Sequence, residues 1–177
     1  MKKRNEACVS TPAYILLGSN LGDREKNLTH AKSKLEAVPG LEIVASSAIY
    51  ITEPQQMRGE NPSFMNQVIK IEYQYLPNEL LNALELVEKN LGRTGKGKKE
   101  PRTIDLDILL FGDAIIETEE LSIPHRELLN RPFALVPLLE IDPDIVDPVT
   151  KKPIAQFLNE EDASEIILYK EHVARHI

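Results

Sequence analysis

The chain has 177 residues, is 42% hydrophobic and carries a net charge of −7 at pH 7. This length favours one domain with a real core. The acidic balance disfavours a protein that coats nucleic acid, because such proteins bind phosphates through many lysines and arginines. The single cysteine cannot form an internal disulfide, so a reducing cytoplasm is expected. No apolar run is long enough to predict a signal peptide or a membrane span.

A strand and a helix are predicted at the start of the chain. Residues 1–12 are expected to be a flexible extension, and the apolar run 13–18 predicts the first strand. Asp23 can cap a helix that Gly40 ends. Its apolar positions recur at spacings of three and four residues, at Leu28, Ala31, Leu35 and Val38.

Two more strands and a second helix follow. Residues 41–52 and 64–73 predict strands. Pro77 opens a helix that ends at Gly92 and whose apolar stripe comprises Leu80, Leu84, Val87 and Leu91.

Two polar stretches without periodicity separate these elements. Residues 53–63 and 93–100 contain glycines or prolines among polar side chains, which predicts long loops. Such loops can close over a ligand and exclude water.

A strand that carries two aspartates is predicted next. Its even positions from Ile104 to Leu110 are apolar, so Asp105 and Asp107 share the other face, together with Leu109 and Phe111. The two carboxylates are spaced by about 6.6 Å along the strand. Paired acids on a strand usually face solvent, but the apolar neighbours indicate a covered cleft. This spacing suits two hard divalent cations, and the strand therefore predicts a phosphate-transfer site.

The remaining elements complete a sandwich of helices and strands. Gly112 and Asp113 predict a turn into a short hairpin partner at 114–116. A third helix is expected after Asn130 and before Asp142, with Phe133, Val136 and Leu139 facing inward. This order predicts an α+β sandwich with a mainly antiparallel sheet. Residues 1–177 are expected to form one catalytic domain. Helices would cover one face, and the other face would be open for ligand.

Four motifs resemble one enzyme family. The aspartate segment 101–112 resembles the signature of 6-hydroxymethyl-7,8-dihydropterin pyrophosphokinase, an enzyme of folate biosynthesis. The other motifs occur in the same order at 18–23, at 50–54 with 64–66, and at 123–125 with 130–133. The resemblance implies a ferredoxin-like fold and the transfer of pyrophosphate from ATP to the pterin hydroxymethyl group, with release of AMP.

The resemblance also implies roles for individual residues. Asp105 and Asp107 would bind two Mg²⁺ ions, and Arg93 and Arg102 would be catalytic cations. The residues implied to contact ATP are Glu88, Ile108, Ser122, His125 and Arg131. Those implied to line the pterin pocket are Thr52, Glu53, Phe64, Asn66 and Phe133. The protein is expected to act as a monomer on these two small molecules, without nucleic acid or membrane partners.

The residues themselves agree with this chemistry and leave two other functions to consider. Phosphoryl-type transfer depends on metals and arginines rather than on a protein nucleophile. The pair Asp105 and Asp107 also suits a two-metal nucleotidyltransferase or nuclease, but such an enzyme usually has a third acid and a basic path for nucleic acid. A non-catalytic RNA-binding module of the same fold would present aromatic side chains where these acids stand.

Five positions differ from the usual family pattern: Gly95, Lys99, Glu100, Glu120 and Arg126.

Overall fold

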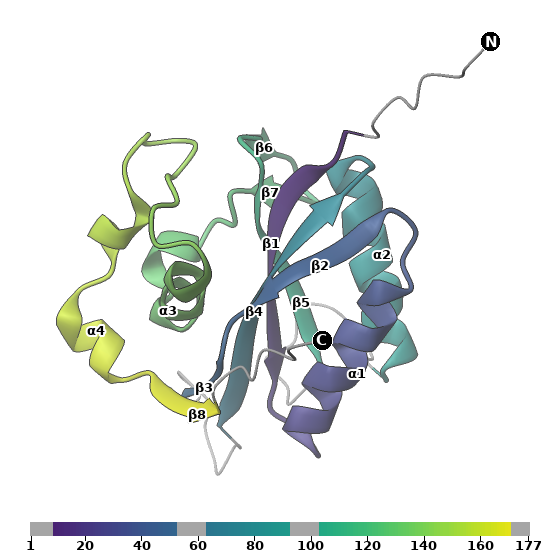
Figure 1. Ribbon diagram of the computed structural model, residues 1–177, viewed down its shortest axis with the longest axis horizontal. Helices are drawn as coiled ribbons and strands as arrows, with labels where there is room; N and C mark the ends of the chain where they lie inside the picture. Colours follow the sequence, from purple (N-terminus) through teal and green to yellow (C-terminus); the bar gives the residue numbers. More distant parts are fainter. Residues whose placement is uncertain (1–8, 53–62, 93–102, 171–177) are drawn as a thin grey trace.

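A computed structural model describes residues 9–52, 63–92 and 103–170, and these form a twisted sheet with helices on both sides (Figure 1). The strand order in the sheet is β5-β1-β4-β3-β8, and β2 also pairs with β4. All of these pairings are antiparallel. The strands are β1 (Thr11–Ser19), β2 (Leu41–Ser46), β3 (Ile49–Thr52), β4 (Phe64–Tyr73), β5 (Asp105–Phe111) and β8 (Ile167–Lys170).

The order of elements confirms the predicted α+β class and its ferredoxin-like arrangement. Helix α1 (Arg24–Glu36) connects β1 to β2, and helix α2 (Pro77–Asn90) connects β4 to β5. The central strands β1 and β4 are therefore neighbours, while β5 pairs with the outer side of β1. This is the split strand-helix-strand topology of the ferredoxin-like fold, which the family resemblance implied.

Helices α1 and α2 cover one face of the sheet, as Figure 1 shows. In α1 the Asp23 side chain accepts a hydrogen bond from the Lys26 amide, and Leu28, Ala31 and Leu35 are buried. In α2 the buried apolar side chains are Leu80, Leu84 and Val87. They pack on the side chains of β1 that alternate toward this face, which are Ala13, Ile15 and Leu17.

The second face is only partly open, which corrects the prediction that helices cover one face alone. Helix α3 (Pro132–Ile141) packs against Tyr14, Leu16 and Val68 of this face. Its predicted inward stripe was only partly right. Phe133 and Leu139 are half-buried and pack against the edge of this cluster, whereas the half-buried Val136 does not belong to it. The buried stripe instead comprises Ala134, Leu135, Pro137 and Leu138. This rotation leaves the ring of Phe133 at the margin of the helix contact.

The predicted strand 41–52 is divided into two shorter strands. Both β2 and β3 pair with β4, at opposite ends of that strand. At the break, the Ser47 amide donates to the Val68 carbonyl and the Ser47 hydroxyl accepts from the Val68 amide. A side chain thus replaces one backbone partner where the regular pairing stops.

The aspartate strand contains an irregularity that the alternating pattern did not predict. Ile15 of β1 pairs with Ile108, and Tyr14 pairs with Leu110, so Leu109 is an extra residue in β5. The bulge reverses the alternation beyond it. Phe111 therefore packs on the α1–α2 side, although it was expected to share the aspartate face. Leu109 and Leu110 both pack toward α3.

Two further predictions of local structure were wrong at the edges. The hairpin after β5 does not pair with β5, because β6 (Ile116–Glu117) and β7 (Ser122–Ile123) form their own two-stranded sheet. Strand β1 begins at Thr11, so the last two residues of the expected extension 1–12 belong to the sheet. Residues 1–8 lie outside the described residues.

The C-terminal part wraps around the α3 side (Figure 1). After α3 it contains η2 (Ile154–Phe157) and α4 (Glu160–Ser164), and then β8 pairs with β3; η1 (Leu128–Asn130) directly precedes α3. The predictions did not include these elements. Among the described residues, no helix is both long and apolar enough to span a membrane.

Candidate active site

Strand pairing brings the predicted metal and pterin residues to one face of the sheet. Gly18 of β1 lies opposite Asn66 on one side and Asp105 on the other. Leu16 lies opposite Asp107 and packs toward α3. Residues directly opposite each other in an antiparallel pair share a face. Asp105, Asp107 and Asn66 therefore face the second side of the sheet, at its margin with α3.

The predicted pterin residues on β3 and β4 contact each other. Asn66 is 3% exposed, and its Nδ2 donates a hydrogen bond of 2.9 Å to the Thr52 hydroxyl. Phe64 of β4 lies opposite Thr52 and is half-buried. Because Asn66 has donors and an acceptor, its amide can pair with a flat heterocycle that also has both.

Gly18 keeps the space beside this amide clear. A Cβ atom at Gly18 would lie 3.4 Å from Oδ1 of Asn66 and 3.8 Å from Cδ1 of Phe64. The motif that contains Gly18 was recognised in the sequence, but no role was predicted for the glycine. Its position between Asn66 and Asp105 became apparent only from the strand register.

Arg131 connects the aspartate strand to the first turn of α3. Its Nη1 lies 3.8 Å from Oδ2 of Asp107, and both side chains are 31% exposed. Its guanidinium carbon lies 5.7 Å from the ring centre of Phe133. A pair with this exposure contributes little to stability. It does, however, place a cation, a carboxylate and an aromatic ring together beside the sheet.

His125 lies next to this cluster and is held by the backbone. Its amide donates to the Leu109 carbonyl at the bulge of β5, and its Nδ1 accepts from the Glu127 amide at 3.1 Å. Burial and the neighbouring Arg131 lower the pKa of His125 to about 4. The ring is therefore neutral near pH 7. Because Nδ1 accepts, we assign the proton to Nε2, which makes that atom a hydrogen-bond donor.

The lowered pKa of His125 predicts a pH dependence of stability. Unfolding returns the ring to its ordinary pKa of about 6.5, so the unfolded chain binds the proton more readily. His125 therefore destabilises the fold as the pH falls from about 6.5 toward about 4. We expect His125→Asn to reduce the loss of unfolding free energy over this range in urea titrations. His30, which is exposed on α1, supplies the control substitution. An unchanged pH profile in His125→Asn would contradict a neutral, half-buried ring.

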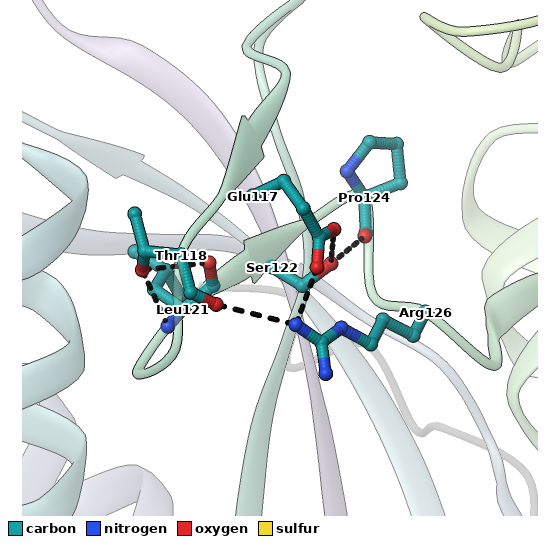
Figure 2. Close-up of polar contacts among 6 residues, drawn as sticks. All are labelled: Glu117, Thr118, Leu121, Ser122, Pro124 and Arg126. Atoms are coloured by element: carbon teal, nitrogen blue, oxygen red, sulfur yellow. Dashed lines mark hydrogen bonds and ion pairs between the residues drawn. The ribbon is translucent and has the colours of Figure 1, made fainter.

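Ser122 belongs to a polar network in the β6–β7 hairpin, which Figure 2 shows. Its hydroxyl lies 2.9 Å from Oε2 of Glu117 and 3.1 Å from the Pro124 carbonyl. Arg126 pairs with the same Glu117 and also donates to the Thr118 carbonyl. The hydrogen bonds from Ser122 and Arg126 lower the pKa of Glu117. The network fixes the segment that leads into His125.

Two residues expected to contact ATP, Ile108 and Glu88, do not lie on the α3 side of the sheet with Asp105 and Asp107. The Ile108 side chain is buried in the core under α1 and α2, so only its backbone can meet a ligand on the α3 side. Glu88 of α2 is 3% exposed, and its Oε1 accepts a hydrogen bond of 2.7 Å from the Leu106 amide. This bond attaches α2 to the outer edge of the aspartate strand. Contact of either residue with ATP stays a prediction.

Three predicted residues lie outside the described residues. They are Glu53, Arg93 and Arg102. The loops 53–63 and 93–100 that were proposed as lids also lie outside them, except for Ser63. The Ser63 carbonyl accepts a hydrogen bond of 2.6 Å from the Arg24 guanidinium.

The aspartate pair fits magnesium held jointly with phosphates. Within the described ranges, no group of three or more His, Cys, Asp or Glu residues could hold a metal ion. Mg²⁺ in phosphate-transfer sites is commonly bound by one or two carboxylates, with phosphate and water oxygens as its other ligands. Asp105 and Asp107 are half-buried on one face and supply carboxylates of this number and kind.

Comparisons with known proteins identify the family of this chain. The family model of 7,8-dihydro-6-hydroxymethylpterin-pyrophosphokinase matches residues 14–143. The folic acid synthesis protein fol1 of Schizosaccharomyces pombe is 41% identical over 157 residues, which is 89% of this chain and 21% of that protein. The 2-amino-4-hydroxy-6-hydroxymethyldihydropteridine pyrophosphokinase of Aquifex aeolicus is 41% identical over 144 residues, which is 81% of this chain and 88% of that protein.

The fold is also similar to that of solved structures. A Plasmodium falciparum HPPK-DHPS structure has a TM-score of 0.66 at 16% identity and covers 89% of this chain and 42% of that one. The chain spans about a fifth of the Schizosaccharomyces pombe and Pneumocystis carinii relatives, and most of the bacterial ones. The family match covers most of the chain and includes both aspartates, and so this protein belongs to the 7,8-dihydro-6-hydroxymethylpterin-pyrophosphokinase family.

Proposed function

We propose that this protein transfers pyrophosphate from ATP to the hydroxymethyl group of 6-hydroxymethyl-7,8-dihydropterin, as a step of folate biosynthesis. One observation carries the proposal. The paired carboxylates of Asp105 and Asp107 share a sheet face with the buried amide of Asn66, and Gly18 lies between Asn66 and Asp105. A site for phosphate-bound cations thus adjoins a site for a flat polar ring.

The reaction is a substitution at phosphorus. The hydroxymethyl oxygen attacks the β-phosphorus of ATP, and the bond from this phosphorus to the α–β bridging oxygen breaks. AMP leaves with that oxygen, and the hydroxyl proton is released. The protein needs no nucleophile of its own, because positioning and charge stabilisation provide the catalysis.

The described residues divide into two groups for this reaction. Asn66 and Thr52 would orient the pterin by hydrogen bonds, and the rings of Phe64 and Phe133 would pack against its faces. For the nucleotide, Arg131 would pair with phosphate oxygens, and Nε2 of His125 would donate a hydrogen bond. Ser122 belongs to the hairpin that leads into His125 and would lie near the nucleotide.

Asp105 and Asp107 would hold the magnesium ions. When bound, these ions would neutralise the phosphate charge that otherwise repels the attacking oxygen. Without them, the two carboxylates would themselves repel ATP, so we propose two Mg²⁺ ions that bind together with the nucleotide. Arg131 already lies within 3.8 Å of Asp107, which indicates that this part of the face accommodates opposite charges.

The products of the reaction test the proposal. The protein is incubated with ATP, Mg²⁺ and the hydroxymethyl dihydropterin, and the nucleotides are separated. We expect one AMP for each pterin diphosphate formed, with no AMP when the pterin is omitted. Formation of ADP, or release of AMP without the pterin, would refute pyrophosphate transfer. Cleavage of a DNA or RNA substrate would instead support the two-metal nuclease considered from the sequence.

Arg102 provides a further prediction from the sequence alone. A guanidinium that stabilises the transferred group chiefly in the transition state should affect turnover more than substrate binding. We expect Arg102→Ala to lower kcat by about 100-fold while the Kd for the pterin changes by less than about threefold. Single-turnover kinetics and pterin binding measure the two quantities. A defect confined to binding would contradict the catalytic assignment.

The proposal also covers the setting of the reaction. We propose that residues 1–177 act as one catalytic domain, because one continuous sheet carries the site residues of β1, β3, β4 and β5. We propose action as a monomer. The single cysteine favours the cytoplasm as the compartment.

A further inference from the structure

The two walls of the proposed pterin pocket come from different layers of the fold. Thr52 and Asn66 belong to strands β3 and β4, whereas Phe133 belongs to the first turn of α3. A pocket of this kind keeps its width only if the helix is held at a constant distance from β3. The contacts between α3 and β3 are therefore important for binding.

Glu140 provides a direct connection between these layers. It lies in the last turn of α3, and its Oε1 accepts a hydrogen bond of 2.9 Å from the Ala48 amide. Its Oε2 accepts a second bond of 2.6 Å from the Tyr50 hydroxyl. Both carboxylate oxygens of one side chain thus bind the β3 region.

Glu140 supplies a hydrogen-bond acceptor for the Ala48 backbone amide at a break in the sheet. Ala48 lies at the break between β2 and β3, where regular pairing with β4 stops, and it is 4% exposed. A buried backbone amide that loses its acceptor is costly. Glu140 therefore also fixes the path by which the chain enters β3.

Tyr50 carries this connection to the pocket. It lies two residues before Thr52 on β3, and it pairs with Asn66 across the strands. Its side chain shares a face with those of Thr52 and Asn66. At the other end of the connection, Phe133 is seven residues before Glu140, or about 10 Å along the helix.

We propose that Glu140 is a positioning residue that sets the width of the pterin pocket by holding α3 against β3 through Ala48 and Tyr50. This inference rests on the proposed function. Displacement of a binding group by about 1 Å is enough to impair a site of this kind. No contact between Glu140 and a substrate is involved.

A second tyrosine provides a matched control. The Tyr14 hydroxyl donates a bond of 2.6 Å to Asp142, directly after α3, and Lys70 lies 3.7 Å from the same carboxylate. This contact has the same chemistry and joins the same end of the helix to the sheet. It reaches β1 and β4 and does not reach β3, so its loss should loosen the helix end without altering the Thr52 wall.

Binding of the pterin to the full chain tests the proposal. The Kd is measured by calorimetry with Mg²⁺ and a nonhydrolysable ATP analogue, and the melting temperature is recorded for each variant. We expect Glu140→Ala to raise the pterin Kd about tenfold and Tyr50→Phe about fivefold. Glu140→Gln should stay within about twofold of wild type, because its amide can accept from Ala48 and donate to the tyrosine oxygen. Tyr14→Phe should lower the melting temperature and leave the Kd within about twofold.

The outcomes separate this inference from the proposed function. Wild-type affinity in Tyr50→Phe would overturn the positioning role, even if Glu140→Ala fails to fold. Equal weakening in Tyr14→Phe and Tyr50→Phe would also overturn it, because general loosening of α3 would then explain the effect. Failure of the wild-type protein to bind the pterin at all would refute the proposed function instead.

Discussion

Replacement of Asp105 or Asp107 by alanine is expected to lower kcat by about 1,000-fold or more. Each change removes a carboxylate from the pair that we propose to hold magnesium with the ATP phosphates. Both residues are half-buried on the α3 side of β5, and neither belongs to a buried apolar cluster of the described residues. The loss should therefore affect the reaction far more than the fold.

The aspartate experiment needs a control for charge and for stability. Asp113 is exposed in the turn that follows β5, so Asp113→Ala removes one negative charge at the other end of the same strand. Its kcat should stay within about twofold of wild type, since surface substitutions of this kind are usually near neutral. Thermal melts should show similar stability for all three variants. Near-normal turnover of Asp105→Ala and Asp107→Ala at saturating Mg²⁺ would rule out the metal role.

Replacement of Asn66 by alanine is expected to have the second-largest effect, on binding of the pterin. The change removes an amide that is 3% exposed and that donates to the Thr52 hydroxyl. The pterin would then have polar groups without partners at a buried position of the sheet, which is costly. We expect the pterin Kd to rise by about 10- to 100-fold, with the Kd of the ATP analogue nearly unchanged.

The next residue of β4 offers a matched control for Asn66. Gln67 is 2% exposed and donates to the Ser47 carbonyl, but it lies opposite Leu17 and so faces α1 and α2. Gln67→Met should lower stability through the loss of a buried hydrogen bond and leave pterin affinity unchanged. If both substitutions weakened pterin binding equally, the effect would reflect damage to β4 rather than loss of a pterin contact.

The sequence predicted the elements whose patterns are local. The structure agrees with the predicted apolar stripe of α1, with its cap at Asp23 and with the start of α2 at Pro77. Each of these features depends only on nearby side chains. The aspartate strand was also predicted, because alternation over Ile104 to Ile108 needs no distant partner. The fold class followed from the order of these elements.

The errors occurred where distant contacts override a local pattern. The bulge at Leu109 turns Phe111 to the other face, and pairing with β1 creates it. In α3 nearly every residue is apolar, so periodicity alone could not identify the buried stripe. The break between β2 and β3 is stabilised by Ser47 and Glu140, and the latter is more than ninety residues away in the chain.

The sequence by itself therefore determined which chemical groups the protein has and in which elements they lie, because strand and helix periodicity and short motifs are properties of neighbouring residues. Only the tertiary structure decided which groups share a face. Antiparallel register places Asn66, Gly18 and Asp105 in one row, and the packing of α3 brings Arg131 to Asp107. Contacts between residues so far apart depend on how the layers pack, and no local pattern encodes that packing.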